Sequence, residues 1–92
     1  MKTHSFDSVR DLIKEMDCDE ALFLSPDCYD KAIIGISHDD RIIYSYDKLV
    51  EVVMENAGST FIDARAWVDY NILESLPSMG EYSPIVLFEL DI

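Results

Sequence analysis

The chain has 92 residues, of which 19 are acidic and 7 basic, so its formal net charge at pH 7 is −12. This charge excludes direct binding to nucleic acid or to an anionic membrane surface, because both would repel the chain. Hydrophobic residues make up 49% of the sequence, enough for one modest core, and we expect a single domain over residues 1–92.

The first half of the chain predicts one helix followed by three strands. Apolar residues at intervals of three and four predict a helix over about residues 6–17, with Ser5 as its N-cap. The run EALFLS (20–25) predicts a first strand. The runs KAIIGIS (31–37) and RIIYSY (41–46) are separated only by HDD, which predicts a β-hairpin.

The second half predicts two helices and a last strand. The apolar spacing changes to a helical one over residues 47–57, and Gly58 stands where a left-handed C-terminal residue is expected. Ser59 can cap a further helix over about residues 60–73, and IVLFEL (85–90) predicts the final strand.

This order of elements predicts an α+β fold with a four-stranded, mostly antiparallel sheet and helices on one face. The strands at 31–37 and 41–46 should be central, because their apolar residues stand at consecutive positions. We expect the last strand, 85–90, to pair beside the strand at 20–25.

Within the helix at 60–73, the side chains of Trp67 and Tyr70 follow the helical spacing of Ile62 and Ala66. We therefore expect both aromatic residues in the core or at its edge.

The longest apolar runs are short, such as IVLF at 85–88, whereas a membrane span needs about 20 residues. The first residues lack the apolar stretch of a secretion signal, so we expect a cytoplasmic protein. In that reducing compartment Cys18 and Cys28 should be free thiols.

Groups that could perform chemistry are few. His38, Asp39 and Asp40 could bind a metal or move protons, but they fall at the predicted hairpin tip, where adjacent side chains diverge and aspartate is a common turn residue. Cys18 and Cys28 lie among aspartates whose charge disfavours the thiolate. We therefore predict no catalytic residue, no cofactor and no metal, and we do not expect an enzyme.

Acidic residues recur every four positions on two predicted helices. The two rows are Asp7, Asp11 and Glu15, and Asp47, Glu51 and Glu55. Each like-charge pair at this spacing costs a helix roughly 0.2 to 0.5 kcal/mol. The interval is close to the spacing of phosphates along a nucleic acid strand. The rows either present a nucleic-acid-like surface to a basic protein or form a solvated face that keeps the chain soluble, moderated by Lys14 and Lys48.

An ordered set of motifs covers about residues 20–88. It consists of ALFLSPDCYDKAIIGISHDDRIIYSYDKLVEVVME, then ARAWVDYNI, then GEYSPIVLF. This set resembles a group of small acidic proteins encoded by bacteriophages and prophages. Asn71 belongs to the DYN motif, and as an amide in an apolar stretch it needs partners if buried, so we expect it to bridge its helix to a loop.

The resemblance implies a bacteriophage context, in which small acidic proteins often inhibit CRISPR effectors or mimic nucleic acid. The expected function is inhibition of a nucleic-acid-binding defence protein in the cytoplasm of the bacterial host, through the basic surface of that protein. The expected partner-binding residues are Asp11, Glu15, Glu51, Glu55, Asp39, Asp40, Asp63 and Asp69. The alternative is a structural or interaction protein without nucleic-acid mimicry, which dimerises through a sheet edge or through Phe88, Leu90 and Ile92.

Overall fold

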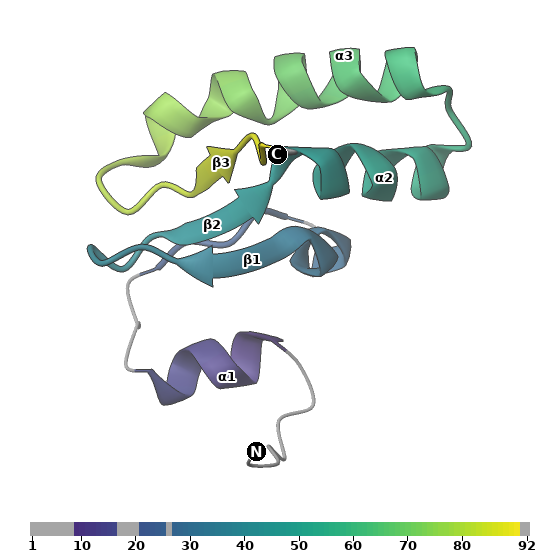
Figure 1. Ribbon diagram of the computed structural model, residues 1–92. Helices are drawn as coiled ribbons and strands as arrows, with labels where there is room; N and C mark the ends of the chain where they lie inside the picture. The colour runs from purple at the N-terminus through teal and green to yellow at the C-terminus, as the bar shows by residue number, and fades with distance from the viewer. Residues whose placement is uncertain (1–8, 17–20, 26, 91–92) are drawn as a thin grey trace.

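The computed structural model describes residues 9–16, 21–25 and 27–90 (Figure 1). Its architecture is α+β, as predicted. The helices and strands, with η for a 3₁₀-helix, are α1 (Val9–Glu15), η1 (Asp27–Ala32), β1 (Ile33–Ile36), β2 (Ile42–Ser45), α2 (Tyr46–Ala57), α3 (Phe61–Asn71), η2 (Leu73–Met79) and β3 (Ile85–Leu87).

Over the described part of the chain, the sheet has three strands in the order β1-β2-β3 instead of the expected four. The predicted hairpin is confirmed, because β1 and β2 pair antiparallel with Ile36 opposite Ile42. The expected strand at 20–25 is wrong, since residues 21–25 form no ladder. The backbone N–H of Leu24 instead donates to the phenol oxygen of buried Tyr44 at 2.8 Å, so this backbone group is used outside a sheet.

The last strand also lies elsewhere than expected. β3 runs parallel to β2, with Ile43 opposite Ile85 and Ser45 opposite Leu87, whereas we expected it beside residues 20–25. A parallel pair requires a long crossover connection, which α2, α3 and η2 provide here. Among the described strands only β2 is therefore central, and β1, expected to be central, is an edge strand.

We had expected all helices on one face of the sheet, but the structure does not place them all there. Figure 1 shows α1 beyond β1 at one side of the molecule, and α2 and α3 packed side by side toward the other. The α1 helix is fixed by Arg10, which contacts Asp30 through Nε at 2.6 Å and Nη2 at 3.1 Å and lies over the Phe23 ring at 4.2 Å. Ile13 is the buried residue of α1. The predicted N-cap Ser5 lies outside the described residues.

The α2 helix follows its predicted boundaries closely. The hydroxyl of Ser45 caps its start by accepting the Lys48 N–H at 3.2 Å. Gly58 ends it in the left-handed conformation, with φ 64°, and donates its N–H to the Met54 carbonyl at 2.9 Å. This conformation is the reason for a glycine at the position. The inner side of α2 is buried through Leu49, Val50, Val52 and Val53.

The α3 helix differs from expectation in its cap and in the direction of its large side chains. Its N-cap is Thr60, not Ser59, and the Thr60 hydroxyl accepts the Asp63 N–H at 3.2 Å. Only the small residues Ala64 and Val68 are buried within α3. Because these two side chains are small, α3 can lie close to α2. The bulky side chains Ile62 and Tyr70 point away from this contact and are exposed.

Two expectations for side chains of α3, those for Tyr70 and Asn71, are wrong. Tyr70 is 71% exposed and lies outside the core, whereas Trp67 is 43% exposed and stacks on buried Tyr29, which places it at the edge of the core. Asn71 is also exposed and donates through Nδ2 to the Trp67 carbonyl at 3.0 Å, one turn back in its own helix. It therefore forms no bridge to a loop.

Candidate partner-binding surface

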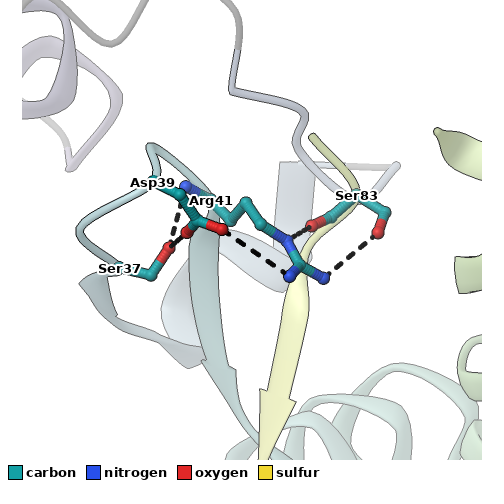
Figure 2. A network of polar contacts seen from close by, with 4 residues as sticks. All are labelled: Ser37, Asp39, Arg41 and Ser83. Carbon is teal, nitrogen blue, oxygen red and sulfur yellow. Dashed lines mark hydrogen bonds and ion pairs between the residues drawn. The ribbon is translucent and has the colours of Figure 1, made fainter. Parts of the chain in front are cut away.

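The turn between β1 and β2 is organised by a polar network (Figure 2). The Arg41 guanidinium donates to the Ser83 carbonyl at 2.8 Å and lies 4.0 Å from the Asp39 carboxylate. The Ser37 hydroxyl donates to Asp39 and accepts the Arg41 N–H at 3.1 Å. The hydrogen bond from Ser37 lowers the pKa of the Asp39 carboxyl. Asp40 takes the left-handed conformation, with φ 65°, which aspartate tolerates in turns.

This network gives the hairpin tip a structural role. Arg41 joins the hairpin to Ser83, just before β3, and it also offsets the charge of Asp39. The prediction that His38, Asp39 and Asp40 form a turn is confirmed. No group of three or more metal-ligating side chains occurs among the residues that the structure describes.

The acidic row of α2 is exposed but interleaved with basic residues. Glu51 and Glu55 line one shallow hollow together with Lys31 and Lys48. The Lys31 Nζ lies 4.0 Å from the Glu55 carboxylate, and both side chains are largely exposed. Two lysines therefore reduce the negative potential of this row at short range.

The predicted acidic residues lie on four separate parts of the fold. Asp11 and Glu15 are exposed on α1, Glu51 and Glu55 on α2, and Asp39 and Asp40 at the hairpin tip, while exposed Asp63 and half-buried Asp69 belong to α3. Figure 1 places α1 and α3 on opposite sides of the sheet. The structure thus does not align these residues in one row, and Asp63 and Asp69 line different hollows even though both belong to α3. Asp7 lies outside the described residues.

Asp69, on α3, has a different environment from the acidic residues of α2. The Tyr46 hydroxyl donates to the Asp69 carboxylate at 2.9 Å and accepts from Arg65 Nε at 3.4 Å. The Arg65 guanidinium also lies 5.7 Å from the ring centroid of Phe61. Its hydrogen bond with Tyr46 raises the pKa of Arg65. Arg65 is the one basic residue between positions 49 and 92, and these contacts keep it close to the helix.

Residues 88–90 follow β3 and cover the start of α2. The Phe88 ring stacks on Tyr46 with centroids 4.2 Å apart, and the Glu89 carboxylate accepts from the Ser45 hydroxyl at 2.5 Å. A carboxylate at this end of α2 is favourable for the helix dipole. Phe88 and Leu90, two of the residues expected in a dimer contact, remain largely exposed, and Ile92 lies outside the described residues.

The outer side of α3 forms a surface that we name the α3 face. It surrounds a shallow hollow of about 300 Å³ and consists of Ile62, Arg65, Ala66, Asp69 and Tyr70. Ile62 is 76% exposed and Tyr70 71% exposed. This apolar surface was missed because the helical spacing of Trp67 and Tyr70 with Ile62 and Ala66 had been assigned to burial. Ala64 and Val68 also stand four positions apart, and this second helical spacing of small apolar residues was the available signal.

Comparison with known proteins gives no further assignment. The chain matches no family model, no curated protein sequence and no solved structure. No helix in the described ranges has both the length and the apolar composition needed to span a bilayer.

Proposed function

We propose that this chain is a non-enzymatic binding protein of bacteriophage type, which inhibits a nucleic-acid-binding protein of a bacterial host by occupying its basic surface. The α3 face is the principal contact in this proposal, and the exposed acidic residues of α2 and α3 supply the attraction to a basic partner.

The observation that carries the proposal is the exposed apolar surface of α3 in a chain whose net charge is strongly negative. Ile62 and Tyr70 are among the most exposed large side chains described. They belong to a half of the sequence, residues 49–92, that holds eight acidic residues and one basic residue. Exposed apolar groups together with aromatic ones are typical of interaction sites. The surrounding charge selects a basic partner and accelerates its association.

The distribution of acidic residues modifies the idea of nucleic-acid mimicry. A strict copy of a phosphate row would use only charge, as the exposed row at Asp47, Glu51 and Glu55 could do on α2. Lysines lie close to that row, and Arg65 lies beside Asp69 on the α3 face, so charge is offset at both places, but only the α3 face adds apolar contact area. We therefore place the main binding energy on α3 and assign the α2 row to long-range attraction.

The proposal can be tested by capture from a bacterial lysate on the immobilised chain. We expect basic nucleic-acid-binding proteins to be retained at low salt and released by high salt or by added DNA or RNA. A purified captured protein should also bind its nucleic acid less well when the chain is present. Retention of partners that are indifferent to both salt and nucleic acid would contradict the proposal.

Two matched variants locate the contact. The double substitution Ile62→Ala and Tyr70→Ala keeps the charge unchanged and should abolish most of the capture. The double substitution Glu51→Gln and Glu55→Gln removes charge from α2 and should slow association while most of the equilibrium binding remains. The reverse pattern would assign the contact to the α2 row.

A second candidate is a homodimer without nucleic-acid mimicry. It is favoured by the position of β3 at an edge of the sheet and by Leu90, which is 82% exposed just after it. Light scattering at two concentrations tests this candidate. A stable dimer that is disrupted by Leu90→Ser would support it, whereas a monomer at both concentrations would exclude it.

A further inference from the structure

A second hollow lies on the other side of α3, between α2, α3 and η1. Its volume is about 370 Å³, within the range of roughly 300 to 1,000 Å³ that is usual for ligand sites. Its apolar walls include Val53 and Ala57 of α2 and the rings of Tyr29 and Trp67. The remaining lining is polar and comprises Cys28, Asn56, Ser59 and Asp63. None of the residues that line this hollow is basic.

Two stacked aromatic side chains line this space. Tyr29 and Trp67 are stacked with ring centroids 6.3 Å apart and an angle of 26° between the planes. Aromatic faces attract cations, and tryptophan does so most strongly. Within the described ranges, the arginines that lie over rings use Phe23, Tyr46 and Phe61, and none is placed over Trp67.

The polar part of the wall offers hydrogen-bond acceptors. The Ser59 hydroxyl oxygen is buried and has no hydrogen-bond partner among the described residues, which is unfavourable for a buried polar atom. Asp63 is exposed at the same hollow, and its carboxylate forms no ion pair in the parts of the chain that the structure describes. Its backbone N–H donates to the Thr60 hydroxyl at 3.2 Å, so the backbone that carries this carboxylate belongs to a capped helix turn.

We propose that this hollow binds one arginine side chain of the basic partner, with the guanidinium stacked on Trp67 and paired with Asp63 and Ser59. The aliphatic part of the arginine would lie against Val53 and Ala57. The inference rests on the proposed function, because it assumes a basic partner, and it adds the residue type that the partner must supply.

Arginine suits this site better than lysine does. Its guanidinium is planar, so it can stack on an indole and still donate hydrogen bonds in its own plane. It is also more weakly hydrated than an ammonium group, so entry into a hollow with apolar walls is less costly. The Ser59 hydroxyl is buried and the Asp63 carboxylate is exposed, and both residues line the hollow, so one guanidinium offers separate N–H groups to the two acceptors.

The test uses three blocked pentapeptides, Gly-Gly-X-Gly-Gly, in which X is arginine, lysine or norleucine. Binding to the whole chain is followed by two-dimensional amide NMR and by tryptophan fluorescence, which reports on this hollow because Trp67 is the only tryptophan. We expect the arginine peptide to bind most tightly and to shift the Trp67 indole N–H and the amides of Ser59 and Asp63. Equal binding of the norleucine peptide, or shifts confined to another surface, would overturn the proposal.

Variants separate the contributions of single groups. Asp63→Asn should weaken binding of the arginine peptide about tenfold, which corresponds to the loss of one charge-assisted pair. Trp67→Leu, followed by NMR, should weaken it comparably while the apolar bulk is retained. Glu74→Gln is the matched control, because Glu74 is exposed on η2 and does not line the hollow, and it should leave the affinity unchanged. A preserved NMR spectrum establishes that each variant is folded.

The outcomes distinguish this inference from the proposed function. If the arginine peptide does not bind while the chain still captures nucleic-acid-binding proteins in a salt-sensitive way, the arginine site is wrong and the proposed function stands. If the peptide binds in the hollow but no such proteins are captured, the site stands and the proposed function is wrong.

Discussion

The α2 and α3 helices both expose charged residues, yet the two helices use their apolar residues differently. The α2 helix places four apolar residues after its first position inside the core and leaves charged residues outside, with two lysines near its glutamates. The α3 helix buries only Ala64 and Val68 and leaves Ile62 and Tyr70 in solvent. A helix whose apolar residues are all used in its own fold has only charge left for a partner. The α3 helix retains apolar contact area as well.

The largest expected difference concerns stability. Leu49→Ala removes a fully buried side chain from α2 and should lower the free energy of unfolding by about 2 to 5 kcal/mol. Ile62→Ala on α3 should change it by no more than about 0.5 kcal/mol, because the side chain is exposed. Urea denaturation measures both values. A similar loss in the two variants would mean that the α3 face belongs to the core and is unavailable to a partner.

Strand β2, which directly precedes α2, carries a pH-sensitive residue, Tyr44. Burial raises the pKa of Tyr44 to about 12, whereas the pKa of an exposed tyrosine is about 10. The unfolded chain therefore loses this proton first, so the stabilisation is complete below about pH 10 and is lost as the pH rises toward 12. Wild-type protein should lose stability steeply across this interval in denaturation experiments.

Tyr44→Phe sharpens the same comparison, because it changes the core without touching either exposed helix side. It leaves the Leu24 N–H without its acceptor and should cost about 1 to 3 kcal/mol at neutral pH. It should also remove the part of the alkaline loss that arises from Tyr44. An undiminished alkaline slope in this variant would assign the effect to another group.

The N-caps allow the two helices to be compared at their starts. Ser45→Ala removes a hydroxyl that accepts the Lys48 N–H and donates to Glu89, whereas Thr60→Ala removes a single contact with the Asp63 N–H. Each cap is worth about 0.5 to 2 kcal/mol, and the larger loss is expected for Ser45, which is also buried. Thermal denaturation of both variants provides the measurement, and an equal loss would show that Glu89 adds nothing.

The smallest effect is expected for the ion pair on the outer side of α2. Lys31→Gln removes the partner of Glu55, and an exposed pair of this kind contributes at most about 1 kcal/mol. The change should be nearly undetectable in unfolding experiments, but it should increase salt-sensitive attraction of a basic partner. A marked loss of stability would indicate that the α2 row is part of the structure and not a free charged surface.

Local features of the sequence predicted the local features of the structure. The HDD sequence predicted the hairpin tip and Gly58 predicted the end of α2, because turn and cap conformations depend on a few neighbouring residues. Residues 21–25 resemble a strand in composition, but the decisive contact of Leu24 with Tyr44 is 20 positions away. The pairing of β3 depends in the same way on contacts that no short window contains.

The candidate surface was predictable only in part. The interval of four identified the exposed acidic residues of α1 and α2, because helical neighbours share a face. It could not show that Lys31, from η1, would lie beside Glu55. Nor could it show that Tyr70 would be exposed. Helical spacing shows which residues share a side of the helix, but it does not show which side the neighbouring helix covers.

The parallel pairing of β2 with β3 has a consequence for biosynthesis. Arg41 and Ser83, which meet at the start of this pairing, are 42 positions apart. At a ribosomal rate of roughly 5 to 20 residues per second, β2 waits about 2 to 8 seconds for its second neighbour. During that interval its free edge is open to other nascent chains, so rapid high-level expression is the condition under which this protein should aggregate.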